Sequence, residues 1–295
     1  MRLLGAKLLA SGPINILVAA FLWGVAGGIG GVLLSKGWDP IVLSLYRGLL
    51  TFGFGLLWLA VSPRNHGLSD LKLWGWSTIA GLGVAGAFSL YFFGMKHSGV
   101  AVAATLLYSA PVYVVLVSLF AGRERPVPGK ALKLVLVIFG VALLSGATIQ
   151  EPSRLDSLGI IAGLFSGACY AAFIFGFRNA SRHGSPQAIM AIAFFVELCV
   201  LFGVTGNRAW IADLFGPDLV NIILLGLVGG GPSFLLYIRG LRNSDPVHAS
   251  YTAMAEPVTA ALFGLFVLGQ MLLPVQVLGG LIVVITIANL RARQH

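Results

Sequence analysis

The chain has 295 residues, of which 58% are apolar or aromatic and only 10% are Asp, Glu, Lys or Arg. A soluble domain carries about 25% charged residues, so a soluble fold of this size has too few charges to cover its surface, and the mean hydropathy of +0.93 indicates an outer surface that faces lipid. The net charge of +9 would suggest nucleic acid in a soluble protein, but the basic residues stand singly between long apolar runs, which argues against a nucleic-acid partner.

Long apolar runs occupy almost the whole chain. A helix that spans a bilayer needs about 20 mostly apolar residues, because about 30 Å of hydrocarbon is crossed at about 1.5 Å per residue. Seven of these runs begin near a proline, which the first turn of a helix tolerates because the missing amide hydrogen would have no partner there. The sequence predicts an all-α membrane protein with ten transmembrane helices. They lie near residues 13–35, 40–61, 73–97, 98–120, 128–148, 156–177, 186–205, 217–241, 246–268 and 273–290.

The distribution of Lys and Arg predicts the orientation of these helices. Of the 19 Lys and Arg residues, fourteen would lie on one side of the membrane and four on the other, and Arg47 lies within the second helix. Because positive residues are retained in the cytoplasm, we expect both termini there. The first apolar run is too long for a signal peptide, so we expect a retained helix in a multi-pass protein of the bacterial inner membrane.

The two halves of the sequence resemble each other at a constant offset of 146 residues, with matches that include Pro, Tyr and Gly. Each half holds five expected helices, so the second copy enters the membrane from the opposite side. The sequence therefore predicts one integrated transport domain made of two inverted repeats, residues 1–148 and 149–295. This architecture is typical of secondary transporters, whose substrate site lies between the repeats. The matches include Pro40 with Pro186, Tyr91 with Tyr237, Gly94 with Gly240, Pro111 with Pro257 and Pro128 with Pro274.

Two matching stretches carry a resemblance to a known family. The fourth helix contains Leu107-Tyr108-Ser109-Ala110-Pro111, and the ninth contains Ala253-Met254-Ala255-Glu256-Pro257. With five plus five helices, the chain resembles the drug/metabolite transporter superfamily and its EamA family over its whole length. The family usually has an acidic residue after the glycine that follows the second stretch, where this chain has Gln270. The aromatic interior resembles that of the YddG-type aromatic amino-acid exporters.

Ionisable residues inside a membrane helix are costly and often functional, and three of them lie deep in this chain. Glu256 precedes Pro257, which removes a backbone donor and, like Pro111 in the fourth helix, kinks its helix. Glu256 is interpreted either as a substrate or proton site or as a structural carboxylate. For Glu197 we favour a structural bond to a neighbouring helix. For Arg47 we expect, in this order, exposure toward the membrane surface, a carboxylate partner or a substrate carboxylate.

Aromatic and hydroxyl side chains are the other candidates for a substrate cavity. Trp23 stands among glycines, and a buried tyrosine needs a partner for its hydroxyl, which favours helix faces that look into the bundle. By the repeat, Phe88 and Tyr91 would lie at the outer mouth of the pathway and Phe234 and Tyr237 at the cytoplasmic mouth, as gates. The expected cavity residues are Trp23, Phe88, Tyr91, Tyr108, Ser109, Tyr170, Phe234, Tyr237, Tyr251 and Glu256.

The sequence shows no catalytic constellation, no metal-ligand spacing and no need for a cofactor. Its glycine-rich runs lack the Lys and Ser/Thr of a phosphate-binding loop, so we expect a secondary transporter rather than an enzyme. A sparsely charged, aromatic cavity fits export of small neutral or zwitterionic metabolites, above all aromatic or large apolar amino acids. A broad-range exporter of other neutral metabolites or drugs is the alternative. The expected partners are the small-molecule substrate and the lipid bilayer, and a homodimer stays open.

Overall fold

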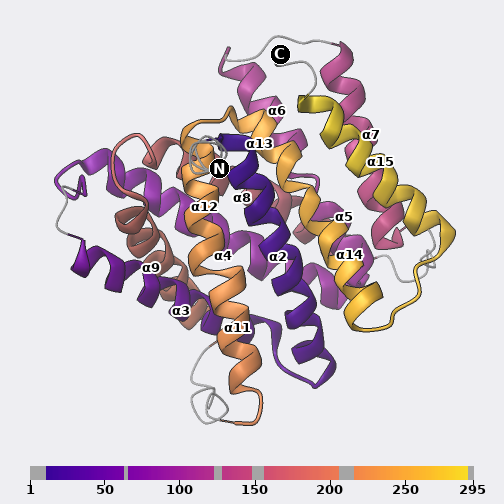
Figure 1. Ribbon diagram of the computed structural model, residues 1–295, viewed down its shortest axis with the longest axis horizontal. Helices are drawn as coiled ribbons and strands as arrows, with labels where there is room; N and C mark the ends of the chain where they lie inside the picture. The colour runs from indigo at the N-terminus through magenta and orange to yellow at the C-terminus, as the bar shows by residue number, and fades with distance from the viewer. Residues whose placement is uncertain (1–10, 63–65, 123–127, 148–155, 206–215, 292–295) are drawn as a thin grey trace, which may run out of the picture.

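The computed structural model describes residues 11–62, 66–122, 128–147, 156–205 and 216–291, which form helices joined by short connections and contain no strand (Figure 1). Eight stretches of these helices are long and apolar enough to cross a membrane, and α15 adds a shorter apolar stretch, Pro274–Asn289. The predicted all-helical membrane class is thereby confirmed, while the count of ten crossings, the inverted repeat and the side of the termini stay predictions. The helices are α2 (Gly12–Ser35), α3 (Pro40–Val61), α4 (Leu71–Ser98), α5 (Val100–Leu107), α6 (Ala110–Phe120), α7 (Pro128–Ser145), α8 (Ser157–Ala180), α9 (Pro186–Thr205), α11 (Leu219–Gly229), α12 (Gly231–Arg242), α13 (Pro246–Ala253), α14 (Ala255–Val267) and α15 (Pro274–Arg291).

Short polar signals fix where several helices begin. Asp39 and Asp245 directly precede a proline, and their carboxylates accept hydrogen bonds from the first free amides of α3 and α13. Asp70 and Asp156 cap α4 and α8 in the same way. A cap of this kind satisfies amides that have no partner within the helix, so these sequence positions define the helix starts locally.

Three of the expected continuous spans are each divided into two helices. The break between α5 and α6 lies at Tyr108 and Ser109, just before Pro111, and the break between α13 and α14 lies at Met254, just before Pro257. The third break, at Gly230 between α11 and α12, has a backbone conformation of φ −116° and ψ −94°. Each proline therefore stands in the first turn of a new helix rather than in the middle of a bent one.

Four antiparallel pairings join helices from the first part of the chain to helices from the second. α4 packs along α8, α2 along α12 and α11, α3 along α9, and α7 along α15 (Figure 1). The ends of α4 and α8 are tied by His97 to Asp156 at 2.7 Å and by His183 to Asp70 at 2.8 Å. Between these ties the backbones touch, because a Cβ atom on Gly176 would lie 2.6 Å from the Ala80 nitrogen.

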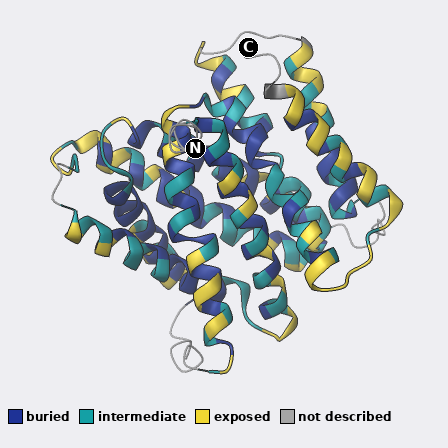
Figure 2. Cartoon of the chain, in the orientation of Figure 1, coloured by how far each residue is buried: buried dark blue, intermediate teal, exposed yellow. Residues whose placement is uncertain are grey.

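The helices around the centre of the molecule form two groups. The α4 group consists of α4, α5, α6 and α8, and the α2 group consists of α2 and α11 to α14; α3 and α9 pack against both. At one end of the molecule the groups meet, where α12 and α13 contact α8 and α6. Buried residues gather where the groups meet, whereas large apolar side chains such as Phe120 and Met271 are exposed (Figure 2). Such an apolar exterior requires a lipid environment.

Candidate functional site

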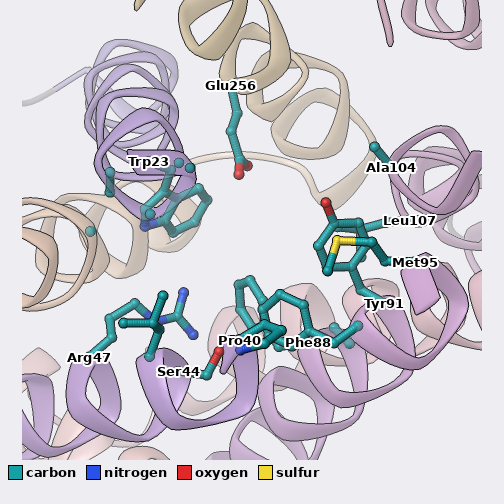
Figure 3. Close-up of a pocket in the computed structure, with 18 of the residues that line it drawn as sticks. Trp23, Pro40, Ser44, Arg47, Phe88, Tyr91, Met95, Ala104, Leu107 and Glu256 are labelled. Carbon is teal, nitrogen blue, oxygen red and sulfur yellow. The ribbon is translucent and has the colours of Figure 1, made fainter. Parts of the chain in front are cut away.

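A cavity of about 450 Å³ lies between the α4 group and the α2 group. Its walls are mostly apolar, and Arg47 and Glu256 are the charged side chains among the described lining residues. Figure 3 shows the Arg47 guanidinium and the Glu256 carboxyl on opposite sides of the open space, with Trp23 on one flank and Tyr91 on the other. The lining reaches Pro40 and Val100, the first residues of α3 and α5, and the 58% exposure of Val100 shows that the mouth of the cavity lies at this end.

The carboxyl group of Glu256 interacts with tyrosine hydroxyls of the α4 group, on the opposite wall of the cavity. The Tyr170 hydroxyl donates to its Oε2 at 3.5 Å, and the Tyr108 hydroxyl interacts with the same carboxyl. Glu256 lies in the first turn of α14, directly after the break at Met254. The helix break thus directs the Glu256 carboxyl toward the cavity, where its hydrogen-bond partners are hydroxyl groups rather than a cation.

Arg47 is held by a buried carboxylate on a neighbouring helix. Its Nη2 atom donates to Glu197 Oε1 at 3.2 Å, and its guanidinium lies 3.9 Å from the centre of the Phe88 ring. The side chain is 10% exposed and that of Glu197 is fully buried. The first-ranked expectation for Arg47, exposure toward the membrane surface, is therefore wrong, because the carboxylate within reach draws the guanidinium inward. The structural bond favoured for Glu197 is confirmed.

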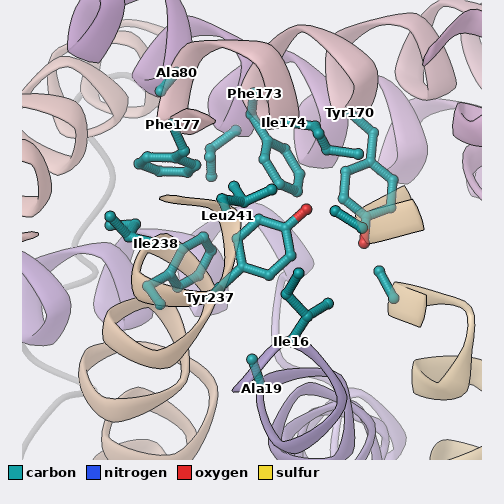
Figure 4. Close-up of a cluster of buried hydrophobic side chains, with 14 of the residues drawn as sticks. Ile16, Ala19, Ala80, Tyr170, Phe173, Ile174, Phe177, Tyr237, Ile238 and Leu241 are labelled. Atoms are coloured by element: carbon teal, nitrogen blue, oxygen red, sulfur yellow. The ribbon is translucent and has the colours of Figure 1, made fainter. Parts of the chain in front are cut away.

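Aromatic rings close one end of the cavity. The centre of the Trp23 ring lies 4.9 Å from that of Phe234 and 4.7 Å from that of Tyr237, and Tyr237 lies 5.9 Å from Phe173. Figure 4 shows the Tyr237 ring between Phe173 of the α4 group and Ile16 of the α2 group. Phe234 and Tyr237 are buried, whereas Phe88 and Tyr91 are half-buried. The cavity is thus open at one end and sealed at the other by contacts between the two groups.

Most of the residues expected from the sequence lie along the cavity, and three do not. Ser109 donates to the Leu106 carbonyl at 2.6 Å, at the α5–α6 break. Tyr251 donates to the Lys130 carbonyl at 3.4 Å, and Tyr237 lies behind Trp23 in the aromatic seal. The rotation of each helix about its axis turns these three side chains away from the open space. The expected residues that line it are Trp23, Phe88, Tyr91, Tyr108, Tyr170, Phe234 and Glu256.

Sequence reasoning left several lining residues out of the expected set. Arg47, Ser44 and Phe173 line the cavity, and so does Met95 near its mouth. Phe173 follows Tyr170 at helical spacing, so the sequence pattern could have predicted that both lie on the cavity face of α8. Ser44 and Met95 carry no sequence signal that separates them from other residues of their helices. In the described part of the chain, no group of three or more His, Cys, Asp or Glu residues is arranged to hold a metal ion.

Comparisons with known proteins place the whole chain in one class. The model of the EamA-like transporter family matches twice, over residues 10–146 and 157–291. The uncharacterized transporter YwfM of Bacillus subtilis is 27% identical over 90% of this chain and 88% of its own, and an uncharacterized transporter of Archaeoglobus fulgidus is 30% identical over 91% and 92%. The threonine/homoserine exporter RhtA of Escherichia coli is 26% identical over 90% of this chain and 88% of its own.

A solved crystal structure shares the fold, with a TM-score of 0.74 and 18% identity over 94% of this chain and 96% of that chain. The family match and the apolar helices make the chain a multi-pass protein of the inner membrane with a small-molecule substrate. The resemblance inferred from the stretches around Pro111 and Pro257 is confirmed at the level of the family. The chain belongs to the EamA-like transporter family.

Proposed function

We propose that this transporter exports small neutral or zwitterionic amino acids by alternating access through the central cavity. The observation that carries the proposal is a cavity open at one end, sealed at the other by aromatic rings, and lined by one acidic and one basic side chain. A zwitterion brings two opposite charges and no net charge, so its carboxylate can share Arg47 with Glu197 and its ammonium group can meet Glu256 without adding net buried charge. Strongly anionic or polycationic solutes would need more charges than the described lining offers.

The preference for aromatic or large apolar amino acids is the finer part of the proposal. Trp23, Phe88, Tyr91 and Phe234 line the cavity with ring faces and edges, and each ring pair offers about 0.5–1.5 kcal/mol beyond burial. Binding of this kind is weak and release is fast, which suits export of a surplus metabolite. One relative, RhtA, is named as a threonine/homoserine exporter, and this supports amino acids as the substrate class.

An inverted repeat would supply the second state that alternating access needs. The family model matches each half of the chain once, and the pairing of α4 with α8 has a counterpart in the pairing of α12 and α11 with α2 at the offset of 146 residues. Under this proposal the cavity faces outward, with Phe88 and Tyr91 at the open gate and Phe234 and Tyr237 in the closed one. Exchanging the two gates would produce the inward-facing state of similar energy.

Counterflow in liposomes tests the proposal directly. Liposomes that hold the purified protein and an excess of one unlabelled solute are placed in a solution of the same solute in labelled form. The panel consists of the amino acids phenylalanine, tryptophan, leucine, threonine and glutamate, and of glucose. We expect labelled aromatic and large apolar amino acids to accumulate far above the level in protein-free liposomes. If no amino acid exchanges, the proposal is rejected, and exchange of glucose or other neutral solutes alone would favour the broad-range alternative.

A further inference from the structure

Two buried hydrogen-bond donors in the cavity wall have no partner among the described residues. They are the indole nitrogen of Trp23 and the Nε atom of Arg47, and both side chains line the same cavity. A buried donor without an acceptor is unfavourable, so such groups in native proteins usually serve a ligand or another function. Both are donors, which indicates that the missing partner is an acceptor such as a carboxylate.

The Arg47 guanidinium is held firmly enough to serve as such a site. Glu197 binds its Nη2 atom at 3.2 Å, and its central carbon lies over the Phe88 ring, 3.9 Å from the ring centre. Glu197 reaches α3 closely because Gly48 has no side chain; a Cβ atom there would lie 3.2 Å from Glu197 Oε2. Since a guanidinium has five N–H donors in a fixed plane, this single bond to Glu197 leaves other donors for a second acceptor.

The opposite wall offers what the other end of a zwitterion needs. Glu256, accompanied by the hydroxyls of Tyr108 and Tyr170, projects into the cavity from the α2 group. Figure 3 shows the open space between this carboxyl and Arg47. The two charged groups therefore distinguish the ends of an amino acid rather than merely balancing its charge.

We propose that Arg47 and the indole N–H of Trp23 form a carboxylate-binding subsite, with Glu197 as the positioning residue that holds the guanidinium. The substrate then lies with its α-carboxylate toward α3 and its ammonium group toward Glu256. This inference rests on the proposed function, because it assigns the orientation of an amino acid in the same cavity. It goes further by making the free carboxylate a requirement for full affinity.

The test compares an amino acid with its counterpart that lacks the carboxylate. Binding of phenylalanine and of phenylalaninol, which keeps the ring and the ammonium group, is measured by calorimetry on the purified full chain in lipid nanodiscs. We expect the wild type to prefer phenylalanine by about ten- to a hundredfold, as the loss of charge-assisted hydrogen bonds predicts. The ratio of the two affinities is the readout, because a change that only lowers the amount of folded protein leaves it unaltered.

Four variants locate the origin of that preference. Arg47→Gln/Glu197→Gln, which avoids leaving one buried charge unpaired, should bring the ratio close to one, and Trp23→Phe should lower it several-fold. Glu197→Gln keeps an oxygen that accepts from Nη2 and should retain most of the ratio, whereas Glu197→Leu should lower it. The matched control Arg239→Gln, which removes an exposed arginine of α12, should keep the wild-type ratio.

The outcomes separate this inference from the function on which it rests. If the wild type exchanges amino acids but binds phenylalanine and phenylalaninol alike, or if the double variant keeps the wild-type ratio, the carboxylate subsite is overturned and the proposed function stands. If Glu197→Leu and the wild type have the same ratio, Glu197 has no positioning role. If the wild type neither binds nor exchanges any amino acid, both proposals fail together.

Discussion

Replacing Tyr237 tests whether aromatic packing seals one end of the cavity. Its ring contacts Trp23 at 4.7 Å within the α2 group and Phe173 at 5.9 Å across to the α4 group. Only the pair with Phe173 crosses between the two groups, and an aromatic pair contributes about 0.5–1.5 kcal/mol, so removing the ring with Tyr237→Ala weakens the seal by about that amount. Since about 1.4 kcal/mol is tenfold in an equilibrium, the open population at this end should rise about two- to tenfold.

The hydroxyl of Tyr237 supplies a matched control. It is buried and has no hydrogen-bond partner among the described residues, so Tyr237→Phe removes an unsatisfied group and keeps the ring. We therefore expect Tyr237→Phe to hold the seal at least as well as the wild type.

Labelling of a cysteine behind the seal measures the effect. Ala19 is fully buried in the same cluster as Tyr237, and Ala19→Cys is made in a chain whose own free cysteines, Cys169 and Cys199, are replaced by serine. The rate of N-ethylmaleimide labelling should rise with Tyr237→Ala and stay at the wild-type level with Tyr237→Phe. Equal rates in all three proteins would refute the role of the ring, and an equal rise in both variants would assign the seal to the hydroxyl instead.

Three further predictions concern charge, packing and capping. Glu256→Gln removes the carboxyl that faces the cavity, so counterflow of amino acids should fall about tenfold or more; full exchange with an unchanged pH profile would exclude a coupling role. Gly176→Ala places a Cβ atom 2.6 Å from the backbone of α4 and should cost about 1–3 kcal/mol, seen as a lower melting temperature in detergent, whereas Gly53→Ala meets nothing within 4 Å and should not lower it. Hydrogen bonds from the Leu158 amide and from His97 hold the pKa of Asp156 below its usual value. The stabilisation by Asp156 is therefore present above the pKa of the unfolded carboxyl and is lost as the pH falls through the folded-state pKa. The melting temperature of Asp156→Ala should lie below that of the wild type at neutral pH and converge with it in acid; a constant difference would contradict this assignment.

The features that the sequence could predict are those with a local physical cause. Helix starts follow from the caps Asp39, Asp70, Asp156 and Asp245 and from the prolines beside two of them. The cavity position of Glu256 was open to prediction because a carboxyl in an apolar helix next to a proline needs a polar surrounding. The family followed from short stretches around two prolines.

The features that could not be predicted depend on how helices rotate and pair. In a soluble helix the apolar face marks the core, but in a membrane helix both the core and the lipid side are apolar. The sequence pattern therefore does not show that Tyr251 and Ser109 face away from the cavity. Arg47 and Glu197 are 150 positions apart, and only the packing of α3 on α9 brings them together. The sequence predicted kinks at Pro111 and Pro257, where two spans divide into shorter helices, but it did not predict the break at Gly230, because apolar residues continue through that position.

The pairing of α4 with α8 limits which parts of the protein can move against each other. Their backbones touch at glycines and their ends are tied by Asp–His pairs, and the other three pairings likewise join helices of residues 1–148 to helices of residues 149–295. A rocking motion of one sequence half against the other would tear all four apart. Under the proposed alternating access, the moving units would instead combine helices of both halves, and the substrate's path would open where the two groups of helices separate, along the rings that now bring Tyr237 against Phe173.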